Sequence, residues 1–174
     1  MEHEKGPDLV IRALKELGDA YLWLAGTGSY ESTLRELATE LGLSARIRFL
    51  GWHNDVHPLL RAADVFVCAF RFEVLGNIIL EAHSLPAAAV RSPVPAHLIQ
   101  DGVTGILVSS EDPGAMAAAF KKVIENPHFA RRLGEAGKHQ VQTVYGEKAV
   151  VAQYHALFEE LLSRRCGFSN QIAA

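Results

Sequence analysis

The chain has 174 residues, of which 49% are hydrophobic and 21% charged, and its formal net charge is -3. These values are typical of one compact soluble domain and leave almost no room for a second full-sized domain. No run approaches the roughly 18 consecutive apolar residues that a membrane span requires. Residues 1–4 lack the basic start and apolar run of a signal peptide, so we expect a cytoplasmic chain.

Charge and cysteine content exclude several kinds of binding site. A slightly acidic chain with no stripe of Lys and Arg is not expected to bind nucleic acid. Cys68 and Cys166 are too few for a disulfide framework or a four-ligand zinc site, and the apolar run around Cys68 favours a packing role. His53 and His57 have the spacing of a helical metal pair, but no third ligand is evident nearby, so no metal site is predicted.

Apolar residues at helical spacing alternate with short apolar runs along the chain. Helices are expected over 9–17, 34–41, 56–63, 76–84, 112–125, 127–144 and 147–162, and strands over 21–25, 47–50, 65–69, 87–90 and 105–108. Nearly continuous apolar strands separated by helices are typical of a parallel sheet covered on both faces, and Trp23 is expected in that core. The prediction is an α/β domain over 1–145, an amphipathic helix over 146–165 and a tail over 166–174. Such a sheet normally begins with a strand, so the first strand is expected to be missing.

Two loops that follow strands are candidate sites, because open parallel sheets bind ligands at the carboxyl ends of their strands. The Gly-Thr-Gly of residues 26–28 lacks the third glycine of a dinucleotide fingerprint and is interpreted as a tight turn. Residues 70–77 follow the most apolar strand and lead into a helix whose first amides, on Gly76, Asn77 and Ile78, can hold phosphate oxygens. Glu73 and Glu81 bracket those amides, which suits carbohydrate hydroxyls on either side of a diphosphate.

This pair of glutamates, separated by seven residues that include Gly76, resembles the E-x7-E signature of retaining GT-B glycosyltransferases of family 4 type. The resemblance covers nearly the whole chain, because further matching segments follow in the family's order: Lys5-Gly6, Leu24–Gly28, Phe49–Trp52, Ala63–Val65 and Asp101–Val108. It implies the C-terminal, Rossmann-like, donor-binding half of a GT-B fold.

The resemblance also implies a role for each matching residue. Glu73 would act in catalysis at the donor sugar, and Glu81 would bind the ribose hydroxyls. Lys5 and the amides of Gly76, Asn77 and Ile78 would bind the diphosphate, and Gly51, Trp52 and His53 would border the base. Such enzymes need no cofactor or bound metal, and the sequence contains no Asp-x-Asp. A glutamate of the pair turned away from the crevice, or locked in an internal ion pair, would count against these roles.

The implied function is retaining transfer of a hexose from a nucleotide-diphosphate sugar to a glycan or lipid, in bacterial surface polysaccharide or lipopolysaccharide synthesis. An N-terminal acceptor domain would be supplied in cis or in trans, and the isolated chain is expected to be inactive. The full-length enzyme would be cytoplasmic or peripheral at the inner membrane. The last helix is expected to pack back on the domain or its partner, and an exposed interdomain face would permit self-association.

Two other functions stay open at this point. A non-catalytic nucleotide-sugar-binding or assembly subunit is favoured by the stretch 81–86, which is shorter than the family's usual helix and turn. A nicotinamide-dependent oxidoreductase rests on fold analogy alone. His83 and His97, close to the candidate site in sequence, are interpreted as polar surface residues.

Overall fold

The computed structural model describes residues 1–73, 76–82, 85, 87–90 and 93–171, with the backbone alone described over 87–90, 93–94 and 164–171. Three features named in the sequence analysis are affected. The end of the helix expected over 76–84 and part of the short stretch 81–86 lie outside the described residues, and so does His83. The chain forms two compact units, Met1–Lys138 and His139–Ala174. Each unit is described by itself.

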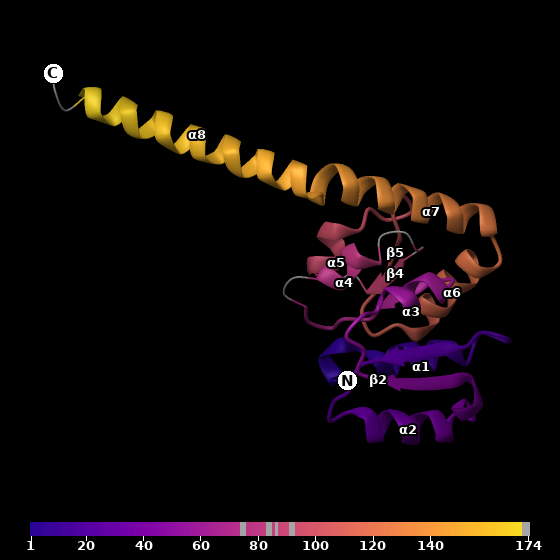
Figure 1. The fold of residues 1–174 in the computed structure, drawn as a ribbon. Helices are drawn as coiled ribbons and strands as arrows, with labels where there is room; N and C mark the ends of the chain where they lie inside the picture. Colours follow the sequence, from indigo (N-terminus) through magenta and orange to yellow (C-terminus); the bar gives the residue numbers. More distant parts are fainter. Residues whose placement is uncertain (74–75, 83–84, 86, 91–92, 172–174) are drawn as a thin grey trace. The chain divides into compact units, whose positions relative to one another are not determined.

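Helices and strands alternate through the first unit (Figure 1). Its elements in chain order are η1 (His3–Lys5), α1 (Pro7–Leu14), β1 (Leu22–Ala25), α2 (Glu31–Glu40), η2 (Ser44–Arg46), β2 (Ile47–Gly51), α3 (His57–Ala62), β3 (Phe66–Cys68), α4 (Asn77–Glu81), β4 (Ala87–Val90), α5 (Pro93–Leu98), β5 (Ile106–Val108) and α6 (Pro113–Ile124). Helix α7 (Pro127–Gln140) begins in this unit and ends in the next one. The second unit continues with a short π-helix (η3, Val141–Tyr145) and the long helix α8 (Glu147–Gln171).

The described strands form two parallel sheets, which confirms the predicted α/β class. Strand β1 pairs with β2, and β3, β4 and β5 pair in that order. In the described part of the chain, β1 and β3 each pair with a single neighbouring strand. Residues of β1 and residues just before β3 line one cavity of about 1000 Å³. The strands are therefore divided into two sheets between β1 and β3.

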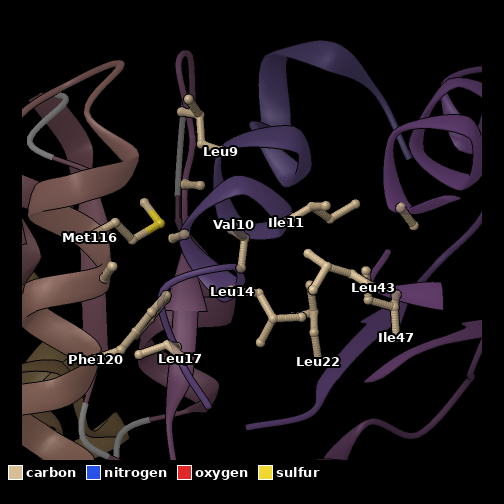
Figure 2. Packing of buried hydrophobic residues seen from close by; sticks show 14 of the residues in the cluster. Leu9, Val10, Ile11, Leu14, Leu17, Leu22, Leu43, Ile47, Met116 and Phe120 are labelled. Carbon is tan, nitrogen blue, oxygen red and sulfur yellow. The ribbon is translucent and has the colours of Figure 1, made fainter. Parts of the chain in front are cut away.

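Helix α1 joins the two parts of the first unit into one core. Pro7 stands in its first turn, where a missing N–H costs nothing, and apolar residues follow at helical spacing. Figure 2 shows its side chains between Met116 and Phe120 of α6 on one side and Leu22 and Ile47 of the β1–β2 sheet on the other. Ile11 is completely buried at the centre of this cluster. Packing on both sides of α1 thus fixes the sheets to one another.

Three details differ from the expectations. Trp23 was expected in the core but is 43% exposed, because only one face of β1 is covered and Trp23 lies on the other. Helix α5 lies in a stretch for which the sequence predicts neither helix nor strand, and α8 continues into the predicted tail as far as Gln171. None of the helices that the structure describes combines the length and apolar character that crossing a membrane would require.

Candidate active site

Lys5 and Glu73, far apart in the sequence, meet at the carboxyl end of β3. The Nζ atom of Lys5 lies 2.6 Å from Oε2 of Glu73, and the same amine lies 4.7 Å from the centre of the Phe70 ring. The Lys5 side chain is 49% exposed, whereas that of Glu73 is 15% exposed. Two residues that the sequence assigned to one site are therefore in direct contact, with the lysine on the solvent side.

The ion pair bears on the predicted role of Glu73. An ion pair between Glu73 and a residue outside the site would count against its role at the donor sugar. The partner of Glu73 is Lys5, which is itself predicted to bind the diphosphate. The pair therefore lies within the predicted site and brings two of its members together.

Residues 1–6 form a bridge between the loop after β1 and the loop after β3. On the β1 side, the amide of Tyr30 donates to the carbonyl of Met1 at 3.1 Å, and Ser29 Oγ donates to Glu2 at 3.0 Å. On the β3 side, the amide of Arg71 donates to the carbonyl of Glu4 at 2.8 Å. The bridge places η1, and Lys5 with it, over the carboxyl ends of the strands.

The same bridge fills the turn at residues 26–28. A Cβ added to Gly28 would come within 2.0 Å of the backbone nitrogen of Met1, so the chain itself occupies the space above this turn. A phosphate cradle needs open backbone amides at this point. The packing agrees with the tight-turn interpretation and gives no support to dinucleotide binding.

Gly76 precedes α4 with a left-handed backbone at φ +66, a conformation that favours glycine, and it is buried. Its carbonyl accepts from the amide of Ile79 at 2.9 Å, which starts the short helix. Asn77 is exposed, Ile78 is half-buried, and Glu81 is exposed at the last position of the helix. The diphosphate and ribose roles of these residues stay predictions.

The residues predicted to border the base lie where β2 ends. Gly51 has φ +73, and its carbonyl accepts from the amide of Gly26 at 2.6 Å, which ties the carboxyl ends of β1 and β2 together. Trp52 is 73% exposed, and its indole N–H donates to Asn54 at 2.9 Å. His53 is also exposed. The aromatic surface of Trp52 is thus available at the edge of the sheet where the site is predicted.

The cavity of about 1000 Å³ lies elsewhere, at the amino ends of β1 and β3, against residues 17–23, 62–65 and part of 121–130. The cavity lies where β1 and β3 are not paired with each other, and none of the predicted site residues lines it. The predicted site residues lie at the opposite edge, where the carboxyl ends of parallel strands lead into helix N-termini.

Other candidate groups have structural roles. Cys68 is buried, and burial raises the pKa of its thiol to about 12, as expected for a packing residue. His57 Nδ1 lies 2.8 Å from Asp55, and no group of three or more His, Cys, Asp or Glu residues suited to a metal occurs in the described part of the chain. His97 is exposed on α5. Independence from metal stays a prediction.

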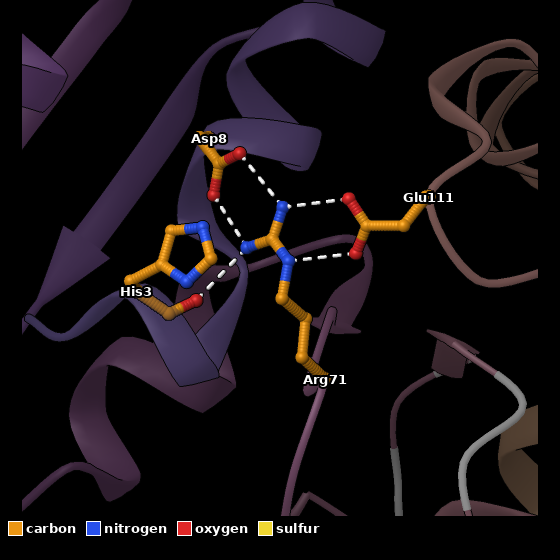
Figure 3. Close-up of polar contacts among 4 residues, drawn as sticks. All are labelled: His3, Asp8, Arg71 and Glu111. Carbon is orange, nitrogen blue, oxygen red and sulfur yellow. Dashed lines mark hydrogen bonds and ion pairs between the residues drawn. The ribbon is translucent and has the colours of Figure 1, made fainter.

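Sequence reasoning missed the role of Arg71, two residues before Glu73. Figure 3 shows its guanidinium between the carboxylates of Asp8 and Glu111, with the carbonyl of His3 beside it. The side chains of Arg71 and Asp8 are only 17% and 12% exposed. The partners lie 63 and 40 residues from Arg71 in the sequence, so no local spacing signals this network.

Comparison with known proteins identifies the family. Residues 1–140 match the family model described as glycosyl transferases group 1. The chain belongs to this family. Among curated group 1 relatives, the lipopolysaccharide core biosynthesis glycosyltransferase LpsE of Rhizobium meliloti is 37% identical over 152 residues. That match covers 86% of the chain and 45% of LpsE, so the chain spans less than half the length of this relative.

Solved glycosyltransferase structures share the fold. Anabaena Alr3699/HepE in complex with UDP superposes with a TM-score of 0.85 at 24% identity, over 93% of the chain and 46% of that protein. The C-terminal domain of a glycosyl transferase group 1 protein (LpcC) from Francisella tularensis superposes with a TM-score of 0.75 at 25% identity. That match covers 84% of the chain and 83% of the domain, so the likeness extends over most of both. The predicted GT-B, Rossmann-like half-fold is thereby confirmed.

Proposed function

We propose that the chain is the nucleotide-sugar-binding half of a retaining glycosyltransferase that transfers a hexose to a glycan or lipid in lipopolysaccharide or surface polysaccharide synthesis. The observation that carries the proposal is the contact between Lys5 and Glu73 at the carboxyl edge of the strands, in a chain of the group 1 family. The biosynthetic role is supported by the named role of LpsE, and the nucleotide by the UDP complex of HepE. We propose that the acceptor binds to an N-terminal domain, supplied in cis or in trans, that corresponds to the part of LpsE outside the match.

The charges at this edge suit a leaving diphosphate. The Lys5 side chain is half exposed, so a diphosphate can reach its amine from solvent. Each hydrogen bond from this amine to the diphosphate contributes about 1.5–3 kcal/mol, which offsets the loss of its bond to Glu73. We propose that this exchange releases Oε2 of Glu73 from the Lys5 amine, so that this oxygen can accept a hydrogen bond from the donor sugar. Lys5 then stabilises the negative charge that develops on the leaving group.

The remaining contacts follow from the positions of the other predicted residues. Glu81, exposed at the end of α4, is proposed to accept hydrogen bonds from the ribose hydroxyls. The amides of Gly76, Asn77 and Ile78 would add donors to the diphosphate, and Trp52 would offer its exposed ring to the base. No metal enters this scheme.

Calorimetric titration of the 174-residue chain with UDP-glucose and GDP-mannose tests donor binding. We expect one of the two donors to bind, and Glu81→Gln to weaken its binding at least about tenfold through the loss of charge-assisted hydrogen bonds. Glu40→Gln is the matched control, because Glu40 is likewise exposed at the end of a helix, α2. Equal affinities for the wild type and Glu81→Gln would remove the ribose assignment, and no binding of either donor would refute the proposal.

A second comparison isolates the diphosphate. Lys5→Ala should weaken binding of UDP much more than binding of uridine, because uridine has no phosphate for the amine to neutralise. Lys15→Ala, at an exposed lysine after α1, should change neither affinity. The same loss for UDP and uridine in Lys5→Ala would mean that the lysine acts on the fold and not on the diphosphate.

Transfer is tested by fusing the chain to the acceptor half of LpsE. Retention predicts that the anomeric configuration of the donor sugar is kept in the product, which proton NMR reads directly. Glu73→Gln should abolish transfer by a fusion that still binds donor. A fusion that binds donor and transfers nothing would favour the non-catalytic subunit.

A further inference from the structure

Arg71 uses every hydrogen-bond donor of its guanidinium within the protein. One nitrogen donates to Asp8 Oδ1 and to the carbonyl of His3, both at 2.8 Å, and a second donates to Asp8 Oδ2 and Glu111 Oε2, both at 2.9 Å. The Nε atom donates to Glu111 Oε1 at 2.6 Å. A guanidinium has five N–H groups, and all five are directed at protein oxygens here. Arg71 therefore has no donor left for a substrate.

The three partners of Arg71 come from three different segments. Asp8 stands in the first turn of α1, His3 begins η1, and Glu111 lies just before α6. Arg71 itself belongs to the loop after β3 that carries Glu73. One side chain thus joins the loop of Glu73 to the segment of Lys5 on one side and to the loop before α6 on the other (Figure 3).

Glu111, which accepts two hydrogen bonds from Arg71, has an unusual backbone conformation. Its φ of 56 makes it the one residue other than glycine with a positive φ in the described part of the chain. This left-handed conformation is unfavourable for a side chain with a Cβ, and a glycine there would be relaxed. Such strain persists only where surrounding contacts over-determine it, and it concentrates at functional sites. The two bonds to Arg71 supply those contacts.

We propose that Arg71 is a positioning residue that sets the distance between Lys5 and Glu73 through its paired carboxylates. This assignment rests on the proposed function, since it names a group that holds the donor site in shape without touching the donor. A positioning role requires geometry as well as charge. Lysine keeps the charge but lacks the planar fork that binds two carboxylates at once.

The test uses three variants of the 174-residue chain and two readouts. Arg71→Lys should weaken binding of whichever of UDP-glucose and GDP-mannose the wild type binds, by roughly 10- to 100-fold, the effect of displacing binding groups by about an ångström. Glu111→Gly should also weaken binding although it relaxes the backbone and keeps or raises the melting temperature. Arg131→Lys is the matched control, because Arg131 forms an exposed pair with Glu135 at 3.7 Å, and its affinity should stay at the wild-type value. In each titration the number of donor molecules bound per chain measures the folded fraction of the variant. The dissociation constant measures the affinity of the folded chains for the donor.

The second readout does not depend on the donor. The rate of acetylation of Lys5, measured by mass spectrometry beside that of Lys15, reports whether the Lys5 amine is still held by Glu73. The rate at Lys5 should rise toward that at Lys15 in Arg71→Lys and Glu111→Gly, and stay unchanged in Arg131→Lys. Should Arg71→Lys fail to fold, Glu111→Gly carries the test alone.

Two outcomes separate this inference from the proposed function. Wild-type affinity together with wild-type acetylation of Lys5 in Glu111→Gly would overturn the positioning role. A wild-type chain that binds neither UDP-glucose nor GDP-mannose would refute the proposed function, and the acetylation rates would then decide the role of Arg71 by themselves.

Discussion

Gly6 packs tightly against Ala69 at the start of the loop of Glu73, and replacing it tests the architecture of the site. Its backbone is left-handed, with φ +62, and an added Cβ would lie 2.0 Å from the carbonyl oxygen of Ala69. The conformation costs an alanine about 1–2 kcal/mol. Displacing a packed backbone adds about 1–3 kcal/mol. We therefore expect Gly6→Ala to lower the free energy of unfolding by about 2–5 kcal/mol, a large part of the roughly 5–15 kcal/mol of a typical domain.

Two other glycines separate the contributions to this loss. Gly42 is left-handed at φ +70 with open space around its Cβ position, so Gly42→Ala should lose only the conformational part, about 1–2 kcal/mol. Gly18 has neither a positive φ nor a neighbour within 4 Å, so Gly18→Ala should be neutral or stabilising by up to about 1 kcal/mol. Urea unfolding followed by fluorescence measures all three, since Trp23 and Trp52 both lie in the first unit. Equal losses in Gly6→Ala and Gly42→Ala would refute the close approach of Gly6 to Ala69.

Two further predictions concern ionisable groups. With its pKa raised to about 12, the Cys68 thiol is thiolate in only about one molecule in 10,000 at pH 8, so iodoacetamide should label Cys68 in urea and not in the native protein, as read by peptide mass spectrometry. Burial alone would raise the pKa of Asp8, but the bonds and charge of Arg71 prevail and hold it below the ordinary 3.8. The stabilisation from Asp8 is therefore complete above that value and is lost as the pH falls through the lower folded pKa. Asp8→Asn should be less stable than the wild type at pH 7, with the difference shrinking below about pH 4; a constant difference from pH 7 to pH 2 would contradict the ion pair.

The fold could be predicted where a local pattern decides it. Leu9, Leu14 and Leu17 belong to a set of apolar residues at helical spacing, and the structure buries all three in the core around α1 and the turn after it. The exposure of Trp23 could not be predicted in the same way. An apolar run indicates a strand covered on both faces, but whether a second layer covers β1 depends on strands and helices distant in the sequence. Helix α5 was missed because two prolines within its six residues favour a loop by local rules.

For the candidate site, too, the residues with a local signal could be predicted and the contacts between distant segments could not. Its residues were named through an ordered series of motifs, and the contact of Lys5 with Glu73 agrees with placing them together. Nothing local could name Arg71 as the residue that joins their two segments, because its carboxylate partners become neighbours only in the folded chain. The positive φ of Glu111 is likewise a property of the fold and not of its neighbours in sequence.

The division of the sheet explains why so many contacts converge on residues 1–6. In the described part of the chain, β1–β2 and β3–β5 share no ladder hydrogen bonds, so no backbone pairing sets the position of one sheet against the other. Their relation depends on α1 in the core and, at the carboxyl edge, on the bridge from the loop after β1 to the loop after β3. Gly6, Arg71 and the Lys5–Glu73 pair all belong to the β3 end of that bridge. A change that displaces packed backbone at this end, such as Gly6→Ala, should therefore lower stability and donor affinity together, whereas a change at Glu81, outside the bridge, should lower affinity alone.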